Sequence, residues 1–226
     1  MTTCPLPPIV FDGVIDVSHH NGAIDWPAVA AAGIALAFVK ATQGTRFVDP
    51  AFARNRSGAA QAGILVVPYH FLDAVDPGHQ ARHFLDVTGL GAGGVAMLDW
   101  ESAAPTETLV ACGRAVADIA GRDPVAYYGF AQLPRADPDL ARWPLMLPAY
   151  PHGNRPGCYA DLVSHPPRLP PGRPSSWDGL CRPYHFHQYT PAGRVAGIAT
   201  AVDRSVWIGT RAELAAWYSS GALPTD

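Results

Sequence analysis

Two carboxyl side chains close together end an apolar stretch near the middle of the chain, Gly94-Val-Ala-Met-Leu-Asp-Trp-Glu101. The stretch predicts a buried strand of a parallel sheet. Because side chains alternate across a strand, Asp99 and Glu101 point to the same side, with Cα atoms roughly 6.5 Å apart. Like charges in a dry environment resist ionisation. The pair therefore suits general acid–base chemistry, and the structural alternative is that the acids cap a following helix.

Strand-like and helix-like segments alternate around this pair. Apolar runs predict strands over residues 11–18, 34–41, 64–71, 94–101, 124–129, 145–150, 186–190 and 201–207. Turn and capping residues predict helices over residues 27–32, 50–62 (with Asp49 as N-cap), 77–85, 106–120 and 210–218. Short connections between alternating elements predict a parallel sheet with right-handed crossovers, and this many strands favour a closed TIM-like (β/α) barrel. In such a barrel, catalytic groups lie at the C-terminal strand ends.

The composition indicates one globular domain. The chain has 226 residues, of which 48% are hydrophobic and 15% charged, and we assign the domain to residues 9–220 and an N-terminal extension to residues 1–8. Residues 151–184 contain eight prolines and no helical period, so we expect a long Pro-rich insertion after the sixth strand. Cys158 and Cys181 lie in this insertion and could pair.

Charge and hydropathy exclude several partners. The net charge of −3 gives no electrostatic footprint for nucleic acid. No apolar run approaches the ~20 residues of a membrane span, so we expect no membrane insertion. No phosphate-binding glycine motif follows a predicted strand, which argues against a nucleotide site.

Eight short motifs in register resemble one family. They follow one another between about residues 12 and 210 and are similar to those of the family 25 glycoside hydrolases, the Chalaropsis-type muramidases. The motifs are Gly13-Val-Ile-Asp-Val-Ser18, Ile24-Asp-Trp26, Phe38-Val-Lys-Ala-Thr-Gln-Gly44, Asp49-Pro50, Pro68-Tyr-His-Phe71, Leu98-Asp-Trp-Glu101, His187-Gln-Tyr189 and Val202-Asp203.

The resemblance implies an irregular β/α barrel that cleaves the β-1,4 bond between N-acetylmuramic acid and N-acetylglucosamine, which is a lysozyme activity. The family's acids carry over as Asp16, Asp99, Glu101 and Asp203. The chain departs from the pattern at 148–150, Pro-Ala-Tyr, where the family shows a Trp-rich strand. The insertion at 151–184 is also longer and richer in proline than in the family, so fine specificity is open.

Cleavage of a glycosidic bond needs an acid and a group that stabilises positive charge. We assign Glu101 as the general acid, its pKa raised by burial near Trp100 and by Asp99, and we expect Asp99 to stay ionised. A nucleophile requires carboxyls about 5–5.5 Å apart and a water-activating base about 6.5–9.5 Å, so the spacing leaves retention and inversion open. A third role, in which Asp99 orients the substrate's own 2-acetamido group, is the one that we favour.

The remaining candidates would flank this pair. We expect Asp16 and Asp203 to be neighbours beside Asp99, although Asp16 could instead bond the local backbone and Asp203 could pair with an arginine. Lys40 is a substrate-binding candidate or a structural partner of the acids. Further candidates for stacking on or hydrogen bonding to sugar rings are Tyr69, Tyr128, Gln188 and Tyr189, each of which could equally belong to the core.

Two other functions compete. A metal-dependent polysaccharide deacetylase would use histidine pairs, and His79/His83 and His185/His187 have ligand-like spacing. The alternative is a non-catalytic glycan-binding protein on the same scaffold. We expect neither metal nor cofactor, because no other ligand motif accompanies these histidines.

The expected partner is the glycan strand of bacterial peptidoglycan, and we expect a monomer. The first residues have neither the basic nor the apolar region of a secretory signal. Since the substrate lies in the cell wall, outside the cytoplasm, we expect delivery by another route, such as a phage lysis system or a bacterial secretion apparatus.

Overall fold

The computed structural model describes residues 9–169, 172–178, 180 and 182–224. The expected N-terminal extension at 1–8 and the Cys158–Cys181 pairing therefore lie outside the described residues. Cys158 itself contacts a carboxylate, with its Sγ 3.0 Å from Oδ2 of Asp161.

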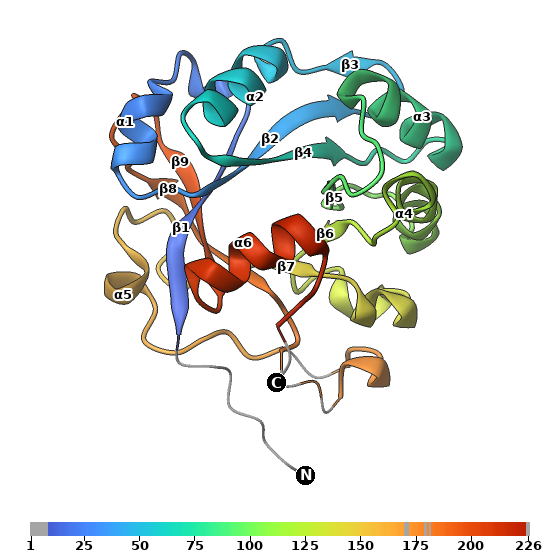
Figure 1. Cartoon of the computed structure of the whole chain (residues 1–226). Coiled ribbons are helices and arrows are strands. Elements are labelled where there is room, and N and C mark those ends of the chain that lie inside the picture. The colour runs from blue at the N-terminus through green and yellow to red at the C-terminus, as the bar shows by residue number, and fades with distance from the viewer. Residues whose placement is uncertain (1–8, 170–171, 179, 181, 225–226) are drawn as a thin grey trace.

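Eight strands close into a barrel (Figure 1). In chain order they are β1 (Val10–Val17), β2 (Leu36–Gln43), β4 (Leu65–Phe71), β5 (Met97–Asp99), β6 (Val125–Tyr127), β7 (Leu145–Pro148), β8 (Phe186–Gly193) and β9 (Val202–Ile208). Neighbours around the ring follow the order β1-β9-β8-β7-β6-β5-β4-β2, and pairing of β1 with β2 closes it. The short strand β3 (Phe47–Val48) pairs with β2 outside the ring. The predicted single α/β barrel is confirmed, and it is irregular.

The prediction of an all-parallel sheet is wrong at β9. This strand runs antiparallel to both β8 and β1. The physical reason is the connection, because residues 194–201 are too few for a crossover, which needs about a dozen residues or more. β8 and β9 consequently form a hairpin, and the first and last strands of the barrel meet directly.

Helices surround the strands. They are α1 (Trp26–Ala31), α2 (Phe52–Gln61), α3 (Pro77–Thr88), α4 (Thr106–Ala120), the short α5 (Tyr159–Leu162) and α6 (Arg211–Ser220). The side chains of Asp25, Asp76 and Thr210 cap the N-termini of α1, α3 and α6. The predicted capping box of Thr210 and Glu213 opens α6. Asp49 is not the N-cap of α2, contrary to the prediction. Its carboxylate accepts from the N–H of Ala51, which is itself the N-cap, and the helix begins at Phe52.

The core has an inner and an outer part. Inward-facing side chains such as Phe38, Met97 and Phe186 fill the barrel, and Leu214 and Trp217 of α6 pack against them. Figure 1 shows α6 lying across one end of the ring. Alternate residues of the same strands pack outward against the helices. The end of the barrel opposite α6 is thus the one left open.

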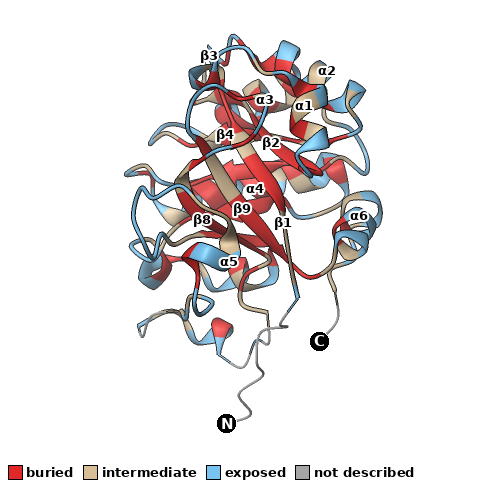
Figure 2. Cartoon of the chain, turned by 90° about the vertical axis from the view of Figure 1, so that its left-hand side faces the viewer, coloured by how far each residue is buried: buried red, intermediate tan, exposed pale blue. Residues whose placement is uncertain are grey.

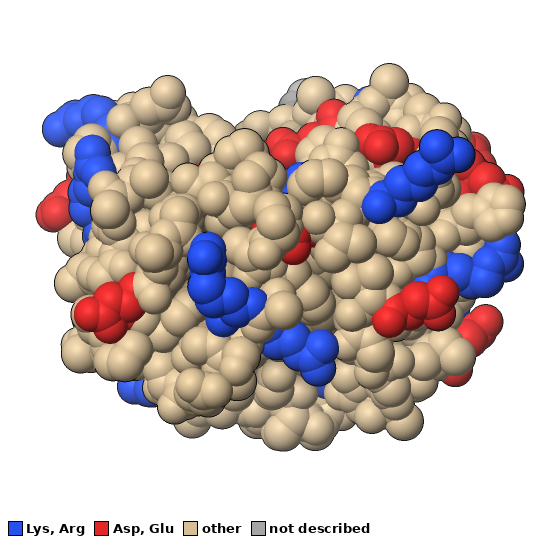
Figure 3. Space-filling model, turned by 90° about the horizontal axis from the view of Figure 1, so that it is seen from above, with Lys and Arg blue, Asp and Glu red and all other residues tan. Residues whose placement is uncertain are grey.

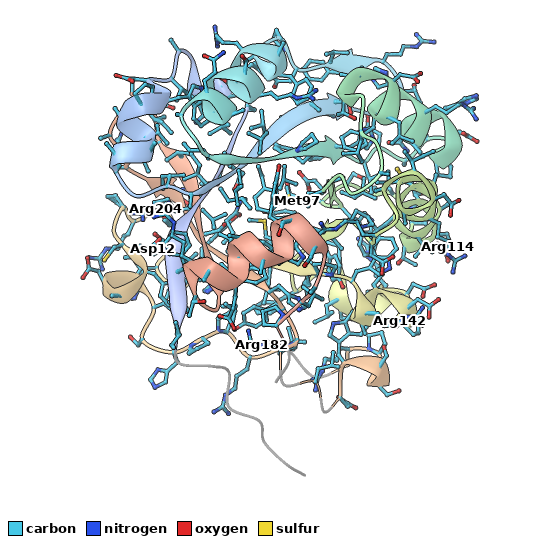
Figure 4. All side chains as sticks on the ribbon, viewed as in Figure 1. Asp12, Met97, Arg114, Arg142, Arg182 and Arg204 are labelled. Atoms are coloured by element: carbon cyan, nitrogen blue, oxygen red, sulfur yellow. The ribbon has the colours of Figure 1, made fainter. Side chains whose placement is uncertain are left out.

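The first part of the expected insertion covers strands in place of a helix. We call residues 149–165 the strap; Figure 2 shows its helix α5 in front of the buried strands β1, β8 and β9. Asp12 on β1 holds it, because its Oδ2 accepts from the backbone N–H of Tyr159 at 3.0 Å. The Oδ1 of Asp12 accepts from Arg204 at 2.8 Å and from the Tyr189 hydroxyl at 2.9 Å, and Figure 4 shows Asp12 and Arg204 side by side.

Candidate active site

A pocket of about 320 Å³ opens at the C-terminal ends of the parallel strands. Its lining contains all four predicted acids together with aromatic and polar side chains: Asp16, Ser18, His20, Lys40, Tyr69, Phe71, Met97, Asp99, Glu101, Tyr127, Tyr150, Gln188 and Asp203. The structure therefore brings together residues that are up to 187 positions apart in the chain, from Asp16 to Asp203.

Strand pairing positions the acids. Asp16 on β1 and Asp203 on β9 are directly opposite each other in the antiparallel register, as expected of neighbours. Asp99 ends β5 and pairs with Phe71 on one side and Tyr127 on the other. Glu101 follows two residues later and is exposed, whereas Asp99 is only 7% exposed. The site thus has a deep carboxyl and a carboxyl at its mouth.

Burial raises the pKa of every acid in the pocket, and repulsion by neighbouring acids adds to this rise at Asp16, Asp99 and Asp203. Desolvation, followed by the charge of Asp203, raises the pKa of Asp16 well above its usual value, and a hydrogen bond from Gln188 opposes this rise. Desolvation raises the pKa of Asp203 to about 6, which a hydrogen bond with Asp16 moderates. Four like-charged groups in one dry pocket cannot all ionise easily. The site therefore retains protons at a pH where free carboxylic acids have lost them.

Burial and mutual contact affect the ionisation of both carboxyls of the Asp99–Glu101 pair. Desolvation and then the charge of Glu101 raise the pKa of Asp99 well above its usual value, and the hydrogen bond between the two carboxyls raises it further. Desolvation raises the pKa of Glu101 too, but the same hydrogen bond lowers it. The expected ionised state of Asp99 stays a prediction, and these effects oppose it in the unliganded pocket. The reason is depth, since the buried carboxyl has lost more hydration than the one at the mouth.

Gln188 links Asp16 to two tyrosines. Its Nε2 donates to Oδ2 of Asp16 at 2.7 Å, and its Oε1 accepts from the hydroxyl of Tyr127 at 2.9 Å and from the hydroxyl of Tyr150. Two donors on the oxygen fix which end of the amide faces Asp16. Gln188 is 3% exposed, so this orientation is held in a dry environment. The predicted polar residue is thereby placed in contact with a predicted acid.

Lys40 reaches the pocket from β2. Its Nζ donates to Oε1 of Gln43 at 3.0 Å and lies 4.9 Å from the ring centre of Phe71. No ion pair within 4.0 Å joins it to an acid among the described residues, yet its charge lowers the pKa values of Asp99 and Glu101. Lys40 therefore acts on the pair through space.

Tyr128 and Tyr189 do not lie where a substrate-binding residue would. Tyr128 is fully buried and packs edge-on to Trp100 in the outer core. Tyr189 is 1% exposed and its hydroxyl bonds Asp12 under the strap. Both side chains point out of the barrel because residues alternate along a strand. Tyr127 and Tyr150 line the pocket instead, and the pairing of Tyr127 with Asp99 is the signal that would have identified it.

The structure also shows which contacts the acids and histidines make in place of the alternative ones considered above. Asp16 bonds Gln188 and not the local backbone, and Arg204 pairs with Asp12 and not with Asp203. Each histidine pair has other contacts: His83 Nε2 lies 3.0 Å from a backbone oxygen, and His187 Nε2 lies 2.8 Å from another. Among the described residues, no group of three or more His, Cys, Asp or Glu side chains is arranged so that it could hold a metal ion.

The surface carries mixed charge. Figure 3 shows basic and acidic side chains scattered over a largely neutral face, with no continuous basic patch. None of the helices in the described part of the chain has the length and hydropathy to cross a membrane.

Comparison with known proteins identifies the family to which these features belong. Residues 15–143 match the family model described as glycosyl hydrolases family 25. The protein YegX of Escherichia coli O157:H7 is 31% identical over 216 residues, which is 90% of this chain and 72% of YegX. Lysozyme M1 of Streptomyces globisporus is 47% identical over 57 residues, which is 25% of this chain and 19% of that lysozyme.

The barrel itself matches solved structures. The bacterial lysozyme of Streptomyces coelicolor superposes with a TM-score of 0.73 and 27% identity, over 92% of this chain and 97% of that one. The superposition therefore extends over nearly the whole barrel.

Proposed function

Because the chain belongs to family 25 of the glycosyl hydrolases, we propose that it is a peptidoglycan hydrolase that cleaves the β-1,4 bond between N-acetylmuramic acid and N-acetylglucosamine. The observation that carries this proposal is the convergence of Asp16, Asp99, Glu101 and Asp203 on one pocket at the open end of the barrel. Lysozymes among the similar proteins favour the same activity.

Glu101 is the general acid of the proposed reaction. It lies at the mouth, where its side chain can reach the oxygen that leaves from a bound glycan. Partial burial raises its pKa, which favours a protonated carboxyl that can donate to that oxygen. Protonation of the leaving oxygen weakens the glycosidic bond as positive charge develops on the sugar ring.

Asp99 stabilises the ring and orients the substrate. Its Oδ1 is buried and has no hydrogen-bond partner among the described residues, a condition that costs free energy until a donor arrives. The N–H of a 2-acetamido group on the substrate is such a donor. Its binding favours an ionised Asp99, and the proton that the pair shares then resides on Glu101. The acetamido oxygen can thereby attack the anomeric carbon, while direct nucleophilic or base roles for Asp99 remain alternatives.

Asp16 and Asp203 are the negative groups beside the reacting sugar. Held by Gln188 and by strand pairing, they stabilise the developing positive charge and accept hydrogen bonds from sugar hydroxyls. Tyr69, Tyr127 and Lys40 line the same pocket and contribute donors and an aromatic surface for the sugar rings.

The experiment is muropeptide analysis of purified peptidoglycan after digestion by the wild type and by Glu101→Gln. We expect new reducing ends at N-acetylmuramic acid from the wild type and a loss of at least about a hundredfold in rate for the variant, the range of general acid catalysis. Glu107→Gln, at an exposed acid in the first turn of α4, is the matched control and should cleave like the wild type.

Each outcome separates the functions. Reducing ends at N-acetylglucosamine would keep a glycosidase but overturn the bond that we assign. Binding of glycan without cleavage by the wild type would favour a binding protein, and release of acetate without reducing ends would favour a deacetylase. Equal cleavage by wild type and Glu101→Gln would refute the role of Glu101.

A further inference from the structure

A second pocket adjoins the first at the end of β2. It encloses about 310 Å³ and is lined by Gln43, Thr45, Arg46, Phe47 and Asp73. These residues come from the end of β2, the turn between β2 and β3, the start of β3 and the loop that follows β4. In Figure 1, β3 lies alongside the C-terminal end of β2 and next to α3. The pocket is therefore on the open end of the barrel, beside the carboxyls.

The walls of this pocket are firmly built. Gly44 has a φ of +54°, and a Cβ at this position would lie 2.5 Å from Oδ2 of Asp73, so the turn fits closely against the loop. The backbone N–H and C=O of Asp73 both bond the fully buried side chain of Gln80, at 2.9 and 3.1 Å. The carbonyl of Phe47 is bonded by His83 at 3.0 Å. Side chains of α3 outside the pocket therefore fix the backbone at Asp73 and at Phe47.

Two opposite charges line the pocket without neutralising each other. Arg46 is exposed and Asp73 is half-buried, and within the described ranges neither forms an ion pair within 4.0 Å. Phe47, 40% exposed, adds an apolar surface between polar groups. A guanidinium, a separate carboxylate and a ring together match a ligand that carries a carboxylate and an ammonium group at some distance from each other.

Contacts connect this pocket to the catalytic one. Gln43 contacts both sides, because its Nε2 donates to Asp73 at 3.4 Å and its Oε1 accepts from Lys40 at 3.0 Å. Lys40 lines the catalytic pocket. Only the side chain of Gln43 consequently separates a ligand bound at Asp73 from Lys40 of the catalytic pocket.

We propose that the pocket lined by Arg46 and Asp73 binds the stem peptide of peptidoglycan. Such a peptide carries free carboxylates, and its diaminopimelate or lysine side chain carries an ammonium group; it is attached to the N-acetylmuramic acid of the strand. Arg46 binds a carboxylate and Asp73 the ammonium group. This inference rests on the proposed function for its choice of substrate, and it makes the enzyme selective for peptide-bearing strands.

The test compares two forms of one substrate. Initial rates of reducing-end release are measured on intact peptidoglycan and on the same glycan stripped of peptides by an amidase. We expect Arg46→Gln to lower the ratio of kcat/KM on intact over stripped glycan about tenfold, the scale of a charge-assisted hydrogen bond. Arg114→Gln, at an exposed arginine on α4 that pairs with Asp139, is the matched control and should keep the wild-type ratio.

A binding measurement keeps the test independent of hydrolysis. The probe is N-acetyl-L-alanyl-γ-D-glutamyl-meso-diaminopimelate, titrated into the wild type and Arg46→Gln while amide NMR shifts are followed. We expect shifts at Gln43, Thr45 and Phe47, and an affinity about tenfold weaker for the variant.

Three results would overturn the proposal. The first is an equal loss of rate on both glycans in Arg46→Gln, which would make Arg46 a glycan contact. The second is a wild-type rate on both glycans, which also leaves the ratio of kcat/KM on intact over stripped glycan unchanged. The third is the absence of peptide-induced NMR shifts at the residues of this pocket. If the wild type cleaves neither glycan, the proposed function fails, and the titration alone then decides whether the pocket binds the peptide.

Discussion

Replacing Gln188 with methionine should shift the ionisation of Asp16. The substitution preserves the shape of the side chain but removes the 2.7 Å donor to Asp16 and the acceptor for the hydroxyls of Tyr127 and Tyr150. A hydrogen bond to a charged group contributes about 1.5–3 kcal/mol, which corresponds to about one to two pKa units. Because this bond opposes the rise in the pKa of Asp16, its loss should raise that pKa further by about this amount.

The assay is a carbon NMR titration of the aspartate carboxyls, with Asp16 assigned by Asp16→Asn. The same shift should move the acidic limb of the pH–rate profile upward, since the proposed mechanism uses an ionised Asp16. Gln61→Met, at an exposed glutamine on α2, is the control and should leave both curves in place. An unchanged pKa of Asp16 in Gln188→Met would refute the reasoning, whatever happened to the rate.

Two further predictions concern stability. Folding raises the pKa of Asp203 from 3.8 to about 6, so the folded chain binds more protons than the unfolded chain between these pH values. The unfolding free energy should therefore fall as the pH rises from about 4 to 6, and this group should contribute at most about 3 kcal/mol to the fall. Urea unfolding across this range should show the slope, and Asp203→Asn should flatten it; an identical slope in the variant would contradict the assignment. Gly113→Ala should destabilise by about 1–3 kcal/mol although alanine favours helices, because the new Cβ would lie 2.0 Å from the ring of Trp143. Gly78→Ala, whose Cβ would meet one atom at 3.4 Å, is the helical control in the same urea experiment, and equal stability of the two variants would show that the ring moves aside freely.

The barrel could be predicted from the sequence because its signals are local. Apolar runs and capping residues located the strands and most helix starts, and the order of motifs indicated the family. The acids were identifiable because a charged residue at the end of an apolar strand is conspicuous. The pairing of Asp16 with Asp203 followed from barrel closure, although the antiparallel direction of β9 was missed. The short loop before β9 was the overlooked evidence for it.

The faces of β6 and β8 could not be predicted because both faces are buried. Val125, Ala126 and Tyr127 are all buried, so the strand has no polar side to distinguish inside from outside, and Tyr128 was chosen over Tyr127. On β8 the strap covers the outer face, which buries Tyr189 as deeply as Gln188. The path of the strap depends on Asp12, which lies 147 positions from Tyr159. Such a contact leaves no periodic pattern in the sequence.

The pairing of β1 with β9 has a consequence for how the protein folds during its synthesis. Asp16 leaves the ribosome long before Asp203, and the ring is open between them until β9 has been made. Contacts so distant in sequence form late in folding. A nascent or prematurely terminated chain that lacks β9 would therefore have the Asp99–Glu101 pair but no closed pocket, and the capacity for hydrolysis would be acquired only after β9 has been made.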